Sequence, residues 1–408
     1  MKNNLLQDST RRHFLREALT VGGLGLSGLM TSPLLANTLD NTSKTEPVVK
    51  IGYLPIADAT ALLLAETQGY LQEEGLEVAV PERVNSWTAL VRGFFSGRYN
   101  VVHFLNPIPI WLRYHFNVPV KIVAWAHTNG SGVVTAPHLN ARTFTDLGGK
   151  QVGVPYWFSM HNMVLQMGLR HAGLTPVIRP AKAAVAAHEV NLRLLPPSLM
   201  VWALQAGNLD AYIVAEPHNA SGEIQAGARL LRFTGDIWRN HPCCVVCMDE
   251  RDTKAYPQWA QKVVNAMVRA QIFAQNNKAD IPRILSQEGR NYLPVPTDLL
   301  DKAINHYSED ETYLKTGAIR HHDWGSGRID FAPWPYPSAT RLIVDNLKQT
   351  LMGHADTRFL QQLDSEFVIN DLVDYDFVRT AMQRYSGWED APGIDYANPF
   401  EREEMIVF

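Results

Sequence analysis

Residues 48–80 read VVKIGYLPIADATALLLAETQGYLQEEGLEVAV, and this stretch decides the fold class of the chain. The run Val48–Leu54 is short, apolar and β-rich, as expected of a buried strand. Apolar residues then recur at roughly helical spacing over Thr60–Glu74, and Leu76–Val80 predicts a second strand. A strand, a helix and a strand in succession indicate a parallel sheet that is covered by helices.

The same alternation continues on both sides of residue 146. The first unit goes on with a predicted helix over Ala89–Phe95 and predicted strands over Asn100–Phe104 and Val120–Ala126. The second unit has three predicted strands and two predicted helices, which are Gln151–Val154, His161–Ala172, Asn191–Leu195, Leu199–Ala206 and Ala211–Val214. Two similar α/β units predict two lobes with a cleft between them, where ligands lie outside the carboxyl ends of the strands.

The remaining chain is predicted to be mostly helical. Helices are expected over Gln258–Gln275, Pro282–Gln287 and Thr297–Asn305, and more helices from Pro337 onward are expected to pack on the first lobe. The predicted domains are therefore residues 48–126 with 249–408 as lobe 1, and 127–248 as lobe 2. Lobe 2 includes two hinge crossings, near His127–Val133 and His241–Met248.

The first forty residues have the pattern of an export signal. Arg11 and Arg12 precede Phe14 and Leu15, and a weakly apolar, glycine-containing segment follows over Ala18–Met30. An apolar segment of about 13 residues is too short to span a bilayer, which takes about 20, and is typical of a signal peptide. The paired arginines resemble a twin-arginine signal. We therefore predict that residues 1–40 are a twin-arginine-type signal peptide with the start of a linker, and that the protein is periplasmic.

Composition and charge exclude several classes of protein. With 37 Lys+Arg against 41 Asp+Glu and a net charge of -4, the chain lacks the basic excess of a nucleic-acid binder. Hydrophobic residues at 46% exclude wholesale disorder, and a total of 3 cysteines excludes a disulfide framework. Nucleophile-elbow, Walker and zinc-protease motifs are absent from the sequence. These absences exclude the corresponding enzyme classes, and we expect no required cofactor.

Several short motifs, in their order and spacing, resemble the periplasmic solute-binding proteins of ABC importers. The resemblance is to the nitrate- and bicarbonate-binding branch of a group that also binds sulfonates, taurine and thiamine precursors, and it covers nearly all of residues 48–385. Its carriers are Gly52–Ile56 with Asp58 and Ala59, Ser86-Trp87, His103–Pro107, Thr128–Gly132, Gly207–Ala211, Glu216–Asn219 and Thr234–Pro242.

This resemblance implies an α/β chain with the type II periplasmic binding protein fold, in which two lobes are joined by a hinge around a central cleft. It also implies the function. A monomer would capture a small anion or a small organic solute between the lobes and deliver it to an ABC permease and its ATPase.

The resemblance also implies the ligand-binding residues. Trp87 lies where the family lines its pocket with an aromatic wall, and packing in the core is the alternative role. His161 matches a pocket histidine of the nitrate binders, although a structural role is open. Asn129 and Ser131 lie where the family places a glutamine that contacts the ligand. Glu216 either contacts the ligand or fixes a loop against the other lobe or the transporter.

Three cysteines depart from the family pattern. Cys244 stands where nitrate binders have a lysine and bicarbonate binders a glutamate, so a nitrate ion would lose its main electrostatic partner. We include Cys244 among the ligand-binding residues, as a determinant of selectivity. In an extended segment Cys243 and Cys247 share one face and Cys244 takes the other.

Three interpretations of the cysteines stay open. They serve as small buried hydrophobic residues, or Cys243 and Cys244 form a vicinal disulfide, or Cys243, Cys244 and Cys247 form a soft-metal or thiol-reactive site for Fe, Cu or Zn. Candidate helpers of a metal site are His127, His161, His218, His241 and Met248. The Cys-Cys-x-x-Cys run also resembles an iron-associated segment of thiamine-pyrimidine synthases, which makes an enzyme on the same fold the alternative function. A lysine to match the one those enzymes use is missing near the corresponding N-terminal site.

Overall fold

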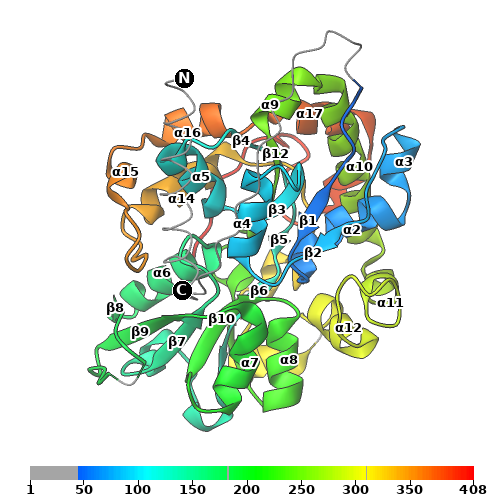
Figure 1. Cartoon of the computed structure of the whole chain (residues 1–408). Helices are drawn as coiled ribbons and strands as arrows, with labels where there is room; N and C mark the ends of the chain where they lie inside the picture. Colours follow the sequence, from blue (N-terminus) through cyan, green and yellow to red (C-terminus); the bar gives the residue numbers. More distant parts are fainter. Residues whose placement is uncertain (1–44, 182, 309) are drawn as a thin grey trace, which may run out of the picture.

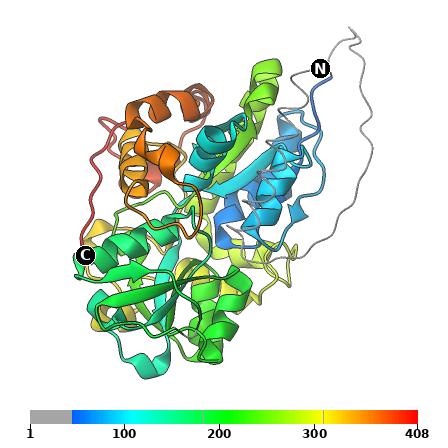
Figure 2. The same ribbon diagram turned by 60° about the vertical axis from the view of Figure 1, so that its left-hand side comes forward.

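The computed structural model describes residues 45–408 with the exception of 182 and 309. It has two α/β lobes, drawn one above the other in Figure 1, and the three-dimensional arrangement is also visible in the turned view of Figure 2. The predicted signal peptide at residues 1–40 lies outside the described residues. In the described part of the chain, the helices are all too short or too polar to cross a bilayer.

Lobe 1 is built on a five-stranded sheet with the order β2-β1-β3-β12-β4. Its strands are β1 (Ile51–Tyr53), β2 (Glu82–Arg83), β3 (Val101–Leu105), β4 (Val120–Trp125) and β12 (Cys244–Asp249). β1 pairs in parallel with β2 and β3, whereas β12 is inserted antiparallel between β3 and β4. All five residues of β3 are buried, as expected of a central strand with both faces covered.

Lobe 2 is built on a six-stranded sheet with the order β11-β6-β10-β7-β9-β8. Its strands are β6 (Ser131–Thr135), β7 (Gln151–Val154), β8 (Thr175–Val177), β9 (Glu189–Leu194), β10 (Ala211–Ala215) and β11 (Arg229–Phe233). β7 to β10 pair in parallel, and β6 pairs antiparallel with both β10 and β11.

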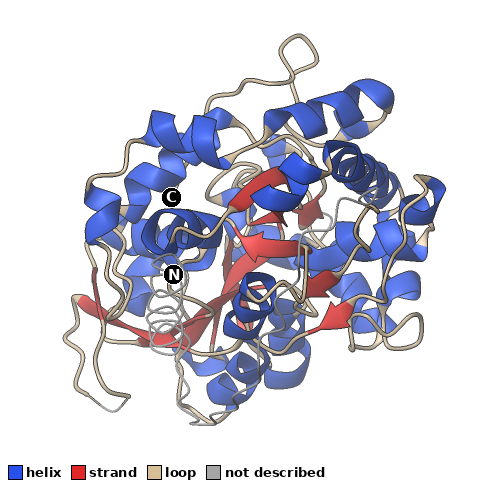
Figure 3. Cartoon of the chain, turned by 45° about the horizontal axis from the view of Figure 1, so that its top comes forward, coloured by secondary structure: helices blue, strands red, loops and turns tan. Residues whose placement is uncertain are grey.

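Helices cover the sheets, as the blue ribbons around the red strands in Figure 3 show. The helices of lobe 1 are α2 (Thr60–Thr67), α3 (Tyr70–Glu73), α4 (Trp87–Phe95), α5 (Pro107–Phe116), α9 (Glu250–Ala255), α10 (Pro257–Asn276), α11 (Ile281–Leu285), α14 (Pro337–Leu347), α15 (Arg358–Gln361), α16 (Ser365–Leu372) and α17 (Tyr375–Arg384). Those that pack on lobe 2 are α6 (Met160–His171), α7 (Pro197–Gln205), α8 (His218–Ala226), α12 (Thr297–Asn305) and α13 (Glu311–Thr316).

The chain passes between the lobes at four places rather than the two that we predicted, and the last of these is its return to lobe 1 at α14. The first crossing links β4 to β6 through β5 (Thr128–Asn129), and the second links β11 to β12. After α11 the chain returns to lobe 2, where α12 packs on α8 and Tyr307 and Tyr313 join the second apolar core. β13 (Ile329–Asp330) then pairs with β5, so a third segment reinforces the hinge.

The predicted domain boundaries therefore need two corrections. Residues 244–248 belong to lobe 1 rather than lobe 2, because β12 forms its hydrogen bonds with β3 and β4. Residues 307–319, which we assigned to lobe 1, join the apolar core of lobe 2 through Tyr307 and Tyr313, whereas α12 lies between α11 of lobe 1 and α8 of lobe 2. Apolar periodicity finds these elements, but the lobe on which an amphipathic helix packs is decided by long-range contacts.

Individual elements agree with the sequence at most places. Gln151–Val154 and Thr297–Asn305 have the predicted bounds as β7 and α12. The predicted strand Leu76–Val80 is wrong, because that segment contributes only the bridge between Val49 and Val78, and the edge strand β2 begins later at Glu82. Leu76 is buried in the core but Val80 is 79% exposed, so this apolar run leaves the core toward the surface at the edge of the sheet.

The lobes are in direct contact, which is the closed arrangement for a two-lobed fold. Trp111 of α5 stacks on Phe158 of lobe 2 with ring centroids 5.0 Å apart. The amide N–H of Leu351, in the loop after α14, donates to Gln166 Oε1 of α6 at 2.9 Å, and Gln166 Nε2 donates to the Leu351 carbonyl at 2.9 Å. The Ala57 N–H donates to the carbonyl of Glu216 at 2.8 Å.

Candidate ligand site between the lobes

Four side chains of lobe 1 and the hinge meet where strands of the first sheet end. Asp58 lies in a short 3-10 helix directly after β1, His127 lies just after β4, and Cys243 and Cys244 lie at the beginning of β12. One ligand atom from each of the four lies within 4.8 Å of all the others, and all four side chains are fully buried. We call these four residues the Asp-His-Cys-Cys cluster. The strand order explains why these four side chains are close together. β3 lies between β1 and β12, and β4 lies on the other side of β12.

The contacts of this cluster converge on one carboxylate oxygen. Asp58 Oδ2 lies 3.2 Å from His127 Nε2, 3.0 Å from Cys244 Sγ and 3.6 Å from Cys243 Sγ. The other oxygen, Asp58 Oδ1, is buried without a hydrogen-bond partner. An unsatisfied buried oxygen costs free energy, so this carboxylate has unused capacity to bind a ligand.

Lobe 2 faces the cluster with two further polar side chains. Ser131 begins β6, and His161 lies in the first turn of α6, which Ser159 caps by accepting the Asn162 N–H at 3.0 Å. Ser131 Oγ lies 2.9 Å from His161 Nε2, and these atoms lie 3.7 Å and 3.9 Å from Cys243 Sγ. His161 Nδ1 is buried and unpartnered. The site is therefore closed by both lobes.

Electrostatics make the two adjacent thiols unequal. Burial alone raises the pKa of Cys243, but hydrogen bonding to Cys244 and the nearby His161 and His127 lower this pKa well below its ordinary value. Burial raises the pKa of Cys244 well above its ordinary value, and the hydrogen bond with Cys243 and the charge of Asp58 add to this. Cys243 is therefore the thiol that ionises, while Cys244 keeps its proton and donates to Asp58.

Asp58 and His127 form a buried ion pair. Burial raises the pKa of Asp58, although the positive charge of His127 opposes the shift. Burial disfavours the charged form of His127, but the charge of Asp58 and the hydrogen bond to it outweigh this and raise its pKa to about 10. In contrast, burial lowers the pKa of His103 to about 3, so this neighbour is neutral and accepts the Leu54 N–H at 3.0 Å.

The structure brings together three of the six predicted ligand-binding residues, namely Ser131, His161 and Cys244. Trp87 lies nearby as the first residue of α4, with its ring centroid 5.5 Å from that of His103. It also lines a small pocket of about 20 Å³ that opens between the lobes beside Tyr156. Trp87 is buried in the apolar core, as the packing alternative implies, and its role as an aromatic wall of the ligand site stays a prediction.

Asn129 and Glu216 make other contacts. Asn129 Nδ2 donates to Asp330 Oδ2 at 2.9 Å, which ties β5 to β13 within the hinge. Glu216 is fully buried in an ion pair with Arg328 at 2.7 Å. Glu216 thus fixes a loop of lobe 2, which agrees with the structural alternative that we gave for it, whereas Asn129 holds the hinge, a role that we did not predict.

The cysteines are arranged differently from the strand-face prediction. Cys243 and Cys244 approach the same oxygen of Asp58, because β12 begins only at Cys244 and Cys243 is free of the strand alternation. Cys247 lies inside β12 opposite Val102, buried and outside the cluster, so it is not placed with the other two as a metal ligand. All three are free thiols, so the structure has no vicinal disulfide among these described residues.

Asp58 and His127 belong to the Asp-His-Cys-Cys cluster, but we did not predict them to bind the ligand. Asp58 entered only as part of a motif, and His127 only as a possible helper of the cysteines. Both follow a strand directly, at the edge where ligands of such sheets bind. That position is the signal that could have identified them.

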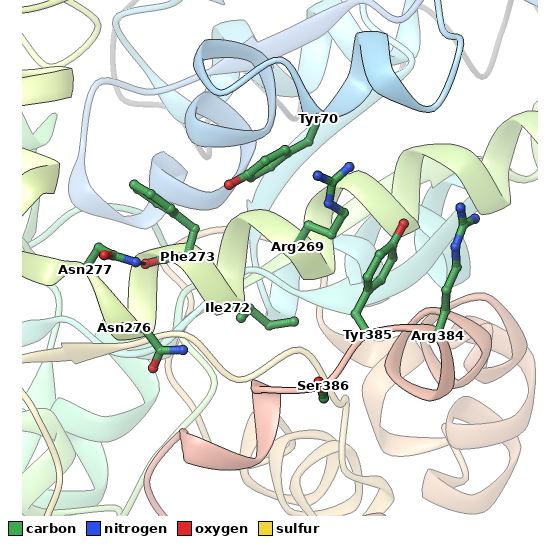
Figure 4. Close-up of a pocket in the computed structure, with 9 residues that line it drawn as sticks. All are labelled: Tyr70, Arg269, Ile272, Phe273, Asn276, Asn277, Arg384, Tyr385 and Ser386. Carbon is green, nitrogen blue, oxygen red and sulfur yellow. Dashed lines mark hydrogen bonds between the residues drawn. The ribbon is translucent and has the colours of Figure 1, made fainter.

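A hollow of about 440 Å³ on lobe 1 is a second candidate for a ligand site (Figure 4). It lies between α3, α10 and α17, and its wall includes Arg269 and Arg384. Arg269 pairs with Glu73 at 2.7 Å and Arg384 with Glu74 at 3.3 Å, so acidic partners already neutralise both cations. None of the predicted ligand-binding residues lines it.

Two α/β lobes, a multiply crossed hinge and a polar site buried between them define a protein with the periplasmic-binding-protein-like fold. The solved structure of the periplasmic nitrate-binding protein NrtA from Synechocystis PCC 6803 has this fold. It superposes with a TM-score of 0.68 at 18% identity and covers 87% of this chain and 97% of that one.

Sequence comparison gives the family. A family model described as the NMT1-like family matches residues 42–286, and the chain belongs to this family. A bicarbonate transport ATP-binding protein, CmpC, from Synechocystis sp. is 25% identical over 62% of this chain and 39% of its own length. The nitrate/nitrite binding protein NrtA from Nostoc sp. is 25% identical over 64% of this chain and 62% of its own. The chain thus spans about two fifths to three fifths of the length of these curated relatives.

Proposed function

We propose that this protein is the solute-binding component of an ABC import system. It captures a small solute between its lobes and hands it to a membrane permease that works with an ATPase. The single observation that carries the proposal is the buried site between the lobes, where Cys243 Sγ lies 3.6 Å from Asp58 of lobe 1 and 3.9 Å from His161 of lobe 2. Each of these two side chains also keeps one buried polar atom without a hydrogen-bond partner. Family membership supports it, since the relatives are described as nitrate/nitrite binding and bicarbonate transport proteins.

Binding and closure follow from the arrangement of the residues. In an open form, lobe 1 and the hinge present Asp58, His127 and the two thiols, while lobe 2 carries Ser131 and His161. A solute that contacts both sets stabilises the closed form, because it gains contacts there that the open form cannot offer. A permease can then distinguish the loaded protein from the empty one by its closure. Ligand binding, rather than catalysis, is the function that we infer.

We also propose that the protein acts in the periplasm after export by the twin-arginine-type signal. The Arg11-Arg12 pair supports this, and the structurally similar nitrate-binding protein is described as periplasmic. Replacing both arginines with lysine is expected to leave the full-length chain inside the cell. Normal export of that variant would contradict the proposed route and leave the binding function untouched.

A binding panel tests the function. Nitrate, bicarbonate, an aliphatic sulfonate and divalent metal ions are each added to the reduced protein, and closure is followed by small-angle scattering and thermal stabilisation. One member is expected to raise the melting temperature and reduce the radius of gyration, and His161→Ala is expected to weaken both effects. His218→Ala, which removes another histidine of lobe 2 outside the cluster, is the matched control. A panel without any closure or stabilisation would contradict the proposal.

A further inference from the structure

The solute site has an unusual charge balance for a protein that takes a simple oxyanion. The Asp-His-Cys-Cys cluster brings one carboxylate, one imidazole and two thiols within 4.8 Å of one another, and it includes neither lysine nor arginine. Oxyanion sites are normally rich in N–H donors and positive charge. The group that best fits two thiols, an imidazole and a carboxylate is a cation.

From these four side chains, and resting on the proposed solute-binding function, we infer that the solute site holds a divalent transition-metal ion of the zinc class. The donors would be Asp58 Oδ2, His127 Nε2, Cys243 Sγ and Cys244 Sγ. Thiolate and imidazole donors favour zinc over the hard ions calcium and magnesium, which require oxygen ligands.

The distances between the donors suit this ion. With zinc bonds of about 2.0–2.3 Å in a tetrahedron, the edge between a nitrogen and an oxygen is about 3.3 Å and that between a sulfur and an oxygen about 3.6 Å. The corresponding distances to Asp58 Oδ2 are 3.2 Å from His127 Nε2, 3.6 Å from Cys243 Sγ and 3.0 Å from Cys244 Sγ. All four donor atoms lie within 4.8 Å of one another, so small movements of the side chains bring them to tetrahedral positions around one ion.

The surroundings of the donors add independent support. His127 Nδ1 lies 3.4 Å from the Thr128 carbonyl, which is the outer contact that fixes the tautomer of a metal-binding histidine and leaves Nε2 for the metal. Asp58 Oδ1 is buried without a hydrogen-bond partner, and the only acidic partner of His127 Nε2 in the cluster is the other oxygen of the same carboxylate, 3.2 Å away. Because buried polar atoms normally have a hydrogen-bonding or coordinating partner, an unpartnered one indicates that a ligand binds there.

The division of the donors between the lobes suggests the order of events. All four belong to lobe 1 and the hinge, so the ion can bind before the lobes close. When the lobes close, Ser131 and His161 of lobe 2 contact Cys243. Closure therefore depends on whether the four donors hold a metal ion.

The test measures zinc directly. The full-length protein is stripped of metal, kept reduced, checked for its 3 free thiols and titrated with Zn²⁺ against a chromophoric chelator. One ion per chain is expected. Cys244→Ser is expected to lower the affinity more than about 100-fold, since even outer-shell changes cost about 10- to 100-fold. Cys247→Ser is the matched control, because this thiol is equally buried three residues along the same strand but outside the cluster, and it should leave affinity unchanged.

A second readout separates direct binding from loss of structure. Co²⁺ in place of Zn²⁺ should give the sulfur-to-metal charge-transfer absorption and the strong visible bands of a tetrahedral thiolate site, reduced in Asp58→Asn and lost in Cys244→Ser. Melting curves of each variant without metal show whether it is folded. A wild-type protein that binds neither ion, or an equal loss in the Cys247→Ser control, overturns the inference.

The outcomes also distinguish the inference from the proposed function. If an anion of the panel closes the lobes while zinc does not bind, the metal site is refuted and the solute-binding function stands. If neither a metal nor an anion binds or closes the lobes, both are refuted. If zinc binds with the variant pattern above and closes the lobes, both are supported.

Discussion

Closure of the two lobes should depend on Gln166, a residue that does not contact the Asp-His-Cys-Cys cluster. This fully buried side chain exchanges two hydrogen bonds with the backbone of Leu351 on the other lobe, each 2.9 Å long. We predict that Gln166→Leu, which keeps the approximate volume but removes both bonds, shifts the molecule toward its open form.

The expected magnitude follows from the bonds that are lost. A net contribution of about 0.5–1.5 kcal/mol for each hydrogen bond gives about 1–3 kcal/mol in favour of opening. That corresponds to a change of about 5- to 150-fold in the closure equilibrium. Because only the closed form binds with all its contacts, the apparent affinity for the ligand should fall by up to the same factor.

Scattering, melting and ligand titration together form the assay. Gln271→Leu is the matched control, since Gln271 is also fully buried and donates to two backbone carbonyls, Trp125 and Ala126, but inside lobe 1. Both variants should melt at lower temperature, while only Gln166→Leu should increase the radius of gyration and weaken ligand binding. Equal scattering and affinity in the two variants would refute the role of this contact in closure.

Three further predictions concern the site and its support. His161→Ala should reduce ligand affinity by more than it reduces the free energy of unfolding, and an unchanged dissociation constant would remove His161 from the site. Glu216→Gln should lower the free energy of unfolding by about 1.5–3 kcal/mol in urea denaturation, because it removes the 2.7 Å counter-ion of the buried Arg328 and leaves only Glu223, at 3.3 Å, as its acidic partner; a loss below 1 kcal/mol would contradict this. Hydrogen bonds from Arg113 lower the pKa of Asp371, so this pair stabilises the fold above the ordinary carboxyl pKa of about 4 and ceases to do so as the pH falls through the lowered value. Asp371→Asn should therefore cost about 1 kcal/mol at pH 7, given partial screening by solvent, and nothing in acid, whereas a cost independent of pH would contradict the assignment.

The alternation of short apolar runs and amphipathic segments was enough to predict the two-lobed α/β fold. Val101–Leu105 and Gln151–Val154 lie in the centres of their sheets, where both faces are buried and periodicity is informative. The antiparallel insertion of β12 could not be predicted, because its partners β3 and β4 are more than a hundred residues away in the sequence. The edge segment Leu76–Val80 was misread because apolar residues at an edge need not form a ladder.

The site was partly predictable for a similar reason. Ser131 and His161 come together beside the cysteine pair, since each lies at a strand end or at a helix start. They contact Cys243, whereas the predicted Cys244 contacts Asp58. The assignment of Asn129 and Glu216 depended on which way a side chain points, and that is fixed by Asp330 and Arg328 from a distant part of the chain. A position in the sequence does not reveal such partners.

The most direct test is a crystal structure of the reduced, ligand-saturated protein, with anomalous scattering recorded when the ligand is zinc. The account predicts closed lobes and ligand density among the side chains of Asp58, His161 and Cys243, with a zinc peak between the two thiols, Asp58 and His127. Density found only elsewhere, such as in the hollow beside Arg269, or lobes that stay open with the ligand bound, would contradict it.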